Sequence, residues 1–343
     1  MIEIPSLLKD LLADSSITDI CLNGHGCLRV ARGNGFEETG PSPFDGKEEE
    51  YRQFVLEQLS LSGKTWDAKL PFVDTVFFNT HRAHLVFPPI SRSGICLSLR
   101  RLPLKTGQDR AATLNAIEAR WSKTPSAFGL LREAVSQHES ILFCGATGSG
   151  KTTLFNDLLA FIPAEERLVA LEDTAEINPS HPHFLSLLSR PPNADGFGGV
   201  TLRDLVRQTL RMKPDRILIG ECRGDEVLDL LLALNTGHRG TLATLHANSA
   251  LDGLKRLELL ALIASKGQIP SNLVRSLIAK GFDKIVHLQN GASGRQISEI
   301  IALEGMERET IVSRKVFPMT QAPSFGESHP SLPPEAGRMF PRG

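Results

Sequence analysis

The sequence ILFCGATGSGKTTLFNDLLAFI occupies residues 141–162. Within it, residues 145–152 match the pattern G-x-x-x-x-G-K-[ST] at every fixed position. An apolar run typical of a strand precedes the glycines, and an apolar run typical of a helix follows them, which is the context that a phosphate-binding loop requires. A chance cluster of small residues would not carry both flanks. The stretch therefore predicts a nucleotide-binding strand–loop–helix unit.

The residues of this loop have distinct expected contacts with a nucleotide. Glycines let backbone N–H groups approach the phosphates, and the N-terminus of the following helix adds partial positive charge. Lys151 is expected to reach the β- and γ-phosphates, and the Thr152 hydroxyl to ligate Mg²⁺. ATP and Mg²⁺ are thus the expected ligands. The predicted nucleotide-binding residues of the loop are Gly145, Ala146, Thr147, Gly148, Ser149, Gly150, Lys151, Thr152 and Thr153.

Short apolar strands alternate with helical segments from residue 140 onward. The strands read ILFCG, RLVALE, RILIGE, TLATLHA and KIVHLQ. This alternation is typical of a largely parallel sheet covered by helices, so we expect an α/β domain over residues 126–315.

The flanking regions have a different composition. Residues 1–102 predict a small α+β domain, with a hairpin at Asn23-Gly24, a helix over 48–60 and further strands. Residues 103–125 are polar and poorly periodic, which predicts a linker. Residues 316–343 hold six of the 21 prolines, which predicts a disordered tail.

Carboxylates end two of the predicted strands. Glu172 ends RLVALE, with Glu176 close behind it, and Glu221 ends RILIGE. Functional groups gather at the carboxyl ends of strands in a doubly wound sheet. We therefore expect Glu221 to polarise the attacking water and Glu172 to organise magnesium or water. The predicted Mg²⁺ ligands are Thr152, Glu172 and Glu221.

Two further patterns allow a structural and a functional interpretation. Arg203, Arg207 and Arg211 recur at i, i+4 and i+8 on one helix face. That face is either ion-paired and solvated, or presented to the nucleotide of a neighbouring subunit. His246 ends a β-rich run, where it is either structural or placed to sense the γ-phosphate.

Charge and cysteine content exclude several classes of protein. The chain has 38 Lys+Arg against 39 Asp+Glu, and the two halves divided at Arg120 are equally balanced, so no basic domain indicates a nucleic-acid partner. Five cysteines without a CxxC pair indicate neither a disulfide framework nor a zinc site. Without an apolar run of membrane-spanning length or a signal-peptide pattern, we expect a soluble cytoplasmic protein.

Four blocks, in order, resemble the motifs of one family. GATGSGKTT, LEDTAEI, LRMKPDRILIGECRG and TGHRGTLATLHANS resemble the Walker A motif, Asp box, Walker B motif and His box of the type II/type IV secretion superfamily ATPases. The run RGDEVLDLLLALNTGHRGTLATLHANSALDGLKRLE most resembles the tight-adherence (Flp) pilus assembly ATPases. The type IV secretion branch shares most of these blocks and is the alternative.

The resemblance implies an α/β fold, with a RecA-like P-loop ATPase domain and a smaller N-terminal PAS-like domain. It implies a homohexameric motor ATPase at the cytoplasmic face of the inner membrane, which binds ATP between the two domains. Domain closure would drive an inner-membrane platform protein in pilus assembly or retraction, or in secretion. A RecA-like nucleic-acid motor is a weaker alternative, since the charge is balanced and aromatic residues for base stacking are scarce.

The resemblance also implies residue roles. It makes Glu221 the catalytic glutamate and assigns Lys151 to the catalytic phosphate loop. Glu172 and Glu176 fall in the Asp box, and His238 and His246 in the His box. The arginine-bearing positions, each implied as a γ-phosphate or interface contact that neutralises transition-state charge, are Arg82, Arg100, Arg101, Arg190 and Arg223.

Overall fold

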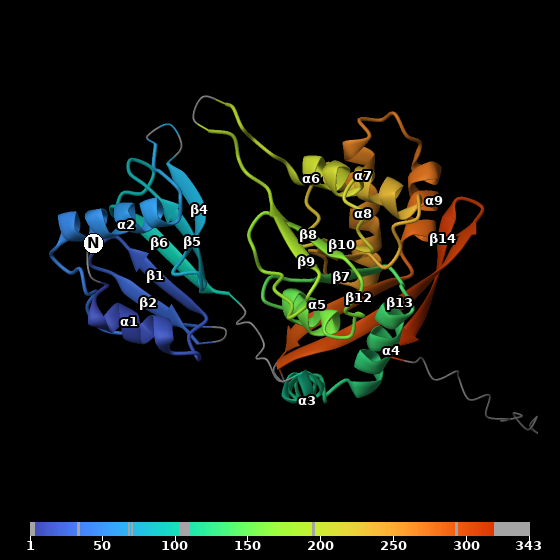
Figure 1. Cartoon of the computed structure of the whole chain (residues 1–343), viewed down its shortest axis with the longest axis horizontal. Helices are drawn as coiled ribbons and strands as arrows, with labels where there is room; N and C mark the ends of the chain where they lie inside the picture. The colour runs from blue at the N-terminus through green and yellow to red at the C-terminus, as the bar shows by residue number, and fades with distance from the viewer. Residues whose placement is uncertain are drawn as a thin grey trace, which may run out of the picture.

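The structure is a computed structural model that describes residues 4–32, 35–67, 69, 71–102, 110–193, 196–291 and 294–318 of the 343-residue chain. These residues form two units, each built on one β-sheet, which lie side by side (Figure 1). Within the described ranges, no helix has both the length and the apolar character needed to cross a membrane.

The N-terminal unit is an antiparallel sheet with strand order β3-β2-β1-β6-β5-β4. Two helices, α1 (Ser6–Ala13) and α2 (Glu48–Leu61), bury Leu8 and Phe54 in its apolar core. The hairpin predicted at Asn23-Gly24 is confirmed as the β1–β2 pair. The strands are β1 (Asp19–Asn23), β2 (Leu28–Ala31), β3 (Phe36–Glu38), β4 (Phe72–Phe77), β5 (His81–Val86) and β6 (Cys96–Arg101).

The C-terminal unit is an eight-stranded mixed sheet with the order β14-β13-β12-β7-β11-β10-β8-β9. Neighbours from β12 to β9 are parallel, whereas β12, β13 and β14 pair antiparallel. The five predicted strands are confirmed as β7 (Ile141–Gly145), β8 (Leu168–Glu172), β10 (Arg216–Ile219), β11 (Leu242–Leu245) and β12 (Lys284–Gly291). The sequence did not predict β9 (Phe184–Leu188), β13 (Gly294–Glu307) or β14 (Thr310–Phe317).

Helices cover both faces of this sheet, so its central strands are buried on both sides. Leu142 and Cys144 of β7 belong to the apolar cluster beneath one set of helices, α6 to α9. Ile141 and Phe143 belong to the cluster on the opposite face. The helices are α3 (Arg110–Arg120), α4 (Pro125–Ser136), α5 (Lys151–Leu159), α6 (Leu202–Thr209), α7 (Glu226–Leu234), α8 (Ala250–Ala264) and α9 (Ser271–Gly281).

The range predicted as a linker contains structure that packs on the C-terminal unit. Helix α3 lies within residues 103–125, and Trp121 after it is 2% exposed. Asp157 on α5 accepts hydrogen bonds from the Trp121 indole (2.8 Å) and the Arg120 guanidinium (2.6 Å). The polar sequence hid this helix because Ile117 is its only residue in the core among those whose side chains are described.

The predicted C-terminal tail also begins later than its composition indicates. Strand β14 extends to Phe317, two residues into the range 316–343, because it pairs with β13. Residues 319–343 lie outside the described part of the chain.

The contact of Asp157 with α3 gives a stability prediction. Asp157→Ala leaves the buried Trp121 indole N–H without its acceptor, so we expect a loss of about 2 kcal/mol in the free energy of unfolding. Urea denaturation monitored by fluorescence measures it. Glu118→Ala is the matched control, since it removes only the exposed Arg132–Glu118 ion pair and should cost about 0.5 kcal/mol or less. Equal effects of the two substitutions would contradict the structural role of Asp157.

Candidate functional site

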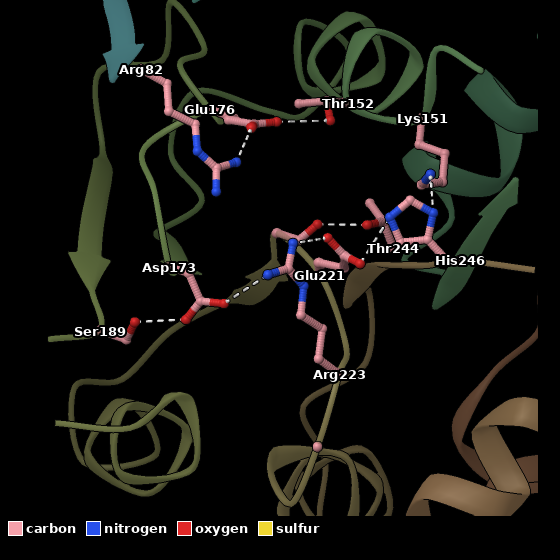
Figure 2. Close-up of polar contacts among 12 residues, drawn as sticks. Arg82, Lys151, Thr152, Asp173, Glu176, Ser189, Glu221, Arg223, Thr244 and His246 are labelled. Carbon is pink, nitrogen blue, oxygen red and sulfur yellow. Dashed lines mark hydrogen bonds and ion pairs between the residues drawn. The ribbon is translucent and has the colours of Figure 1, made fainter. Parts of the chain in front are cut away.

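A cavity of about 310 Å³ lies at the carboxyl ends of β7, β8, β10 and β11. Its opposite wall comes from Arg82, Arg100 and Arg101 on strands β5 and β6 of the N-terminal unit. The first turn of α5 forms its floor. The cavity therefore brings together both units and most of the predicted site residues, as Figure 2 shows for those with polar contacts.

The phosphate loop between β7 and α5 depends on glycine at two positions. Gly150 precedes α5 with a φ of +99°, a left-handed conformation that other residues rarely adopt. A Cβ on Gly145 would lie 2.5 Å from the carbonyl oxygen of Leu288, which leaves no room for a side chain. The loop thus offers backbone N–H groups at a helix N-terminus, an arrangement that fits a phosphate group.

Lys151 folds back over this loop. Its Nζ donates to the carbonyl oxygens of Gly145 (2.8 Å) and Ala146 (2.9 Å) and lies 3.3 Å from His246 Nδ1. Burial lowers the pKa of Lys151, partly offset by the Glu221 carboxylate. An anionic phosphate beside Nζ would favour the charged ammonium, so the lysine fits its predicted role.

Glu221 is held from two sides. Its Oε1 lies 3.0 Å from His246 Nε2, and its Oε2 accepts a hydrogen bond from the Arg223 guanidinium (Figure 2). Burial, and then Lys151, lower the pKa of His246, which favours a neutral imidazole. His246 Nδ1 lies near both Lys151 Nζ (3.3 Å) and the carbonyl oxygen of Gly145 (3.2 Å), while Nε2 faces Glu221. His246 thereby links the phosphate-loop lysine to the carboxylate.

Arg223 is the second residue that orients Glu221. Besides this contact, its Nη1 lies 3.6 Å from Asp173 Oδ2, and Asp173 in turn accepts from Ser189 Oγ at 2.6 Å. The guanidinium is therefore fixed between two carboxylates at the cavity. This network holds Glu221 in place, as a base for water requires.

Glu172 is the most buried carboxylate of the cavity, with 2% exposure. Its Oε1 accepts backbone N–H bonds from Glu176 and Ile177, each 2.8 Å long. Within the described ranges, its buried Oε2 has no hydrogen-bond partner. Burial raises the pKa of Glu172 to about 7. A carboxylate oxygen with spare acceptor capacity fits a magnesium-bound water or the ion itself.

Glu176 joins the two units. One carboxylate oxygen accepts from Arg82 Nη1 at 3.1 Å, and the other accepts from Thr152 Oγ1 at 3.3 Å (Figure 2). The predicted magnesium ligand on α5 and a guanidinium of the N-terminal unit therefore share one acceptor. Arg100 also lines the cavity, and its Nε pairs with Asp19 at 2.8 Å.

Of the three predicted magnesium ligands, two have an oxygen placed to bind the ion. The Thr152 hydroxyl and Glu172 Oε2 are hard oxygen ligands beside the phosphate loop, which Mg²⁺ prefers. Both oxygens of Glu221 already have partners, His246 and Arg223, so its predicted place among the magnesium ligands stays a prediction. Among the described residues, no three acidic, His or Cys side chains form a metal site. The two oxygens of Thr152 and Glu172 alone would still suit Mg²⁺, because this ion takes its other ligands from substrate phosphates and water.

Two of the predicted arginines do not turn their guanidinium groups into the cavity as expected. Arg101 lines it, yet its guanidinium donates to backbone carbonyls of Leu12, Asp14 and Ile17 and so braces the N-terminal unit. Arg190 donates to the carbonyl of Gly198 in its own loop and lies outside the cavity lining.

His238 lies at the wrong end of its strand for a nucleotide contact. It precedes β11, whereas His246 follows it, so about 13 Å of strand separates the two histidines. Its Nδ1 lies 3.3 Å from the carbonyl oxygen of Ala233. The prediction that it contacts a nucleotide in this cavity is therefore wrong.

The arginine face of α6 is ion-paired. Arg203 Nε and Arg207 Nε lie 2.5 and 2.9 Å from the two carboxylate oxygens of Asp229 on α7. For these two arginines the structure supports the paired surface, whereas α6 ends at Thr209, so Arg211 lies beyond the helix and the prediction that it shares this face is wrong.

Several residues that line the cavity were not predicted, and three of them make polar contacts there. Asp173 contacts Arg223, Thr244 Oγ1 donates to the carbonyl of Gly220 at 2.5 Å, and Arg295 reaches the phosphate loop from β13. Asp173 directly follows Glu172 at a strand end, which was an available signal. Arg295 belongs to no motif.

A phosphate loop at the carboxyl edge of this sheet, with a strand-end glutamate beside it, defines a RecA-like P-loop ATPase. The family model described as "Type II/IV secretion system protein" matches residues 62–305, so the chain belongs to that family. The expected superfamily is thus confirmed.

Individual relatives extend this finding. A protein of Mycobacterium tuberculosis whose name assigns it provisionally to conjugal transfer is 37% identical over 308 residues, or 88% of this chain and 85% of that protein. VirB11 of Brucella suis, a type IV secretion system protein, is 31% identical over 323 residues, or 85% and 87% of the two chains. The structure of the Legionella pneumophila ATPase DotB has the same fold, with a TM-score of 0.58 at 18% identity over 88% of this chain and 81% of that chain.

The raised pKa of Glu172 makes stability depend on pH. The unfolded chain loses the proton near 4.5, while the folded chain keeps it to about 7, so stability falls as pH rises through this window. Glu172→Gln removes the cost of burying the charge. We expect its stability gain over wild type to grow by about 2 to 3 kcal/mol between pH 5 and pH 8.

Urea denaturation at the two pH values measures this difference. The control is Glu304→Gln, which replaces an exposed carboxylate paired with Arg314 and should show no such growth. A gain for Glu172→Gln that is the same at both pH values would show that the folded carboxyl titrates normally.

Proposed function

We propose that this ATPase works at the cavity between the two units and powers a type IV secretion machine of the conjugal-transfer class. One observation carries the site assignment. The phosphate-loop Lys151, the strand-end Glu221 and the N-terminal Arg82 converge on one cavity, with His246 joining the first two.

The geometry supports a division of roles during hydrolysis. The loop and Lys151 hold the β- and γ-phosphates of ATP, while Glu221 accepts a proton from the attacking water. Arg223 orients Glu221, and Arg82 supplies positive charge from the other unit as charge develops on the γ-phosphate. Thr152 and Glu172 would hold Mg²⁺, and the ion would supply positive charge that neutralises the phosphates.

The proposed assembly is a homohexamer docked on a membrane-embedded platform protein, so the chain meets the inner face of the membrane through its partner. Family membership supports this proposal. Closure of the N-terminal unit on bound nucleotide would transmit force.

The relatives favour secretion over the tight-adherence pilus that the sequence blocks most resemble. Proteins at 37% and 31% identity bear names from conjugal transfer and type IV secretion. We therefore propose the type IV secretion alternative as the main function.

Two substitutions test the catalytic roles. Lys151→Ala should abolish both ATP binding and hydrolysis, because the phosphates lose their cation. Glu221→Gln should keep ATP binding while hydrolysis falls at least about 100-fold, because the water loses its base. Phosphate release, nucleotide binding and solution mass are measured, with Glu304→Gln as the surface control. Hydrolysis that survives in Glu221→Gln would contradict the mechanism.

A genetic experiment tests the cellular role. Deletion of the gene in the native host, complemented by wild type or by Glu221→Gln, is scored for DNA or protein transfer and for surface pili. We expect transfer to be lost and restored only by wild type. Loss of pili with intact transfer would favour the pilus-assembly function instead. Hydrolysis stimulated by single-stranded DNA would favour a nucleic-acid motor.

A further inference from the structure

Arg295 is held against the phosphate loop by a strand that belongs to none of the sequence motifs. Its Nη1 lies 3.4 Å from Thr153 Oγ1, and its aliphatic stem covers Gly150, where a Cβ would stand 3.0 Å from Arg295 Cδ. The side chain lines the same cavity as Lys151. The guanidinium is therefore already placed at the loop that receives the phosphates.

Three consecutive residues at the start of α5 face three different walls of the cavity. Lys151 points to His246, Thr152 to Glu176 and Thr153 to Arg295. Successive residues of an α-helix differ by about 100° in direction, which explains this divergence. The wall that holds Arg295 is thus separate from the wall that holds the base.

The strand order indicates which end of a bound nucleotide would lie beside each side of the cavity. Glu172, Glu221 and His246 follow β8, β10 and β11, all on one side of β7, whereas Arg295 comes from β13 on the other side. The γ-phosphate must lie on the side of the water-activating carboxylate. The α-phosphate and nucleoside then extend toward β12 and β13.

The charge of Arg295 also lacks an acidic counterpart. Arg82 and Arg223 each pair with carboxylates, but no acidic side chain within the described ranges forms an ion pair with Arg295. A guanidinium matches phosphate oxygens in charge and geometry. We propose that Arg295 binds the α-phosphate of the nucleotide held by its own subunit, an inference that rests on the proposed nucleotide site.

Nucleotide titrations on the full chain with Mg²⁺ test this proposal. The variants are Arg295→Met, which keeps the stem over Gly150, and Arg295→Lys, which keeps the charge. Arg314→Met on the neighbouring β14 is the matched control, because Arg314 is exposed and pairs only with Glu304 among the described residues. The probes are ADP, GDP and a non-hydrolysable ATP analogue.

We expect Arg295→Met to weaken the binding of ADP and of the ATP analogue by the same factor, about tenfold. Any GDP binding by wild type should weaken equally, Arg295→Lys should recover part of the loss, and Arg314→Met should match wild type. Thermal melting checks that each variant folds. If Arg295→Met does not fold, the titrations of Arg295→Lys test the proposal instead, because this substitution should weaken the binding of ADP and of the ATP analogue by the same factor.

Three results would overturn the inference. Unchanged ADP affinity in Arg295→Met would make the residue structural. A loss much larger for the ATP analogue than for ADP would place it at the γ-phosphate, and a loss for ADP without one for GDP would place it at the base. Wild type that fails to bind ADP would instead refute the proposed nucleotide site itself.

Discussion

The parallel register of β7, β8, β10 and β11 is the constraint on which the site depends. Parallel neighbours end at one edge of the sheet, so the residues that follow these strands meet there although they are far apart in the chain. The phosphate loop after β7, Glu172 at the end of β8, Glu221 after β10 and His246 after β11 are all placed this way. Two-sided burial of the strands keeps this edge rigid, because helices cover both faces.

Without a bound ligand, burial at this edge of the sheet makes charged side chains unfavourable. Burial lowers the pKa of Lys151 and raises the pKa of Glu172 to about 7, so both groups are disfavoured in their charged forms. Phosphate anions and a divalent cation favour those same charged forms. The energy of charging these two groups is therefore recovered when nucleotide and metal bind, which couples binding to their ionisation.

Local patterns explain what the sequence could predict. The phosphate loop, five buried strands and the strand-end glutamates are visible because apolar runs and glycines are local signals, and each run adjoins its functional residue. Strand β9 and the β13–β14 hairpin are half-exposed, and the side chains described for α3, apart from Ile117, are exposed or half-buried. The prediction for His238 was wrong for a related reason, because a sequence motif does not say which end of a strand faces the ligand.

Contacts between distant segments could not be predicted at all. Glu176 was assigned to a motif, but only the fold shows that it accepts from both Thr152 and Arg82, 94 residues away in the chain. The Thr152 hydroxyl donates its proton to Glu176, and this hydrogen bond leaves the oxygen lone pairs free to face a metal ion. A carboxylate in that position therefore strengthens the metal ligand and at the same time holds the N-terminal unit. One side chain thus contacts both the N-terminal unit and the first turn of the phosphate-loop helix, so a change at either of these two places is felt at the other.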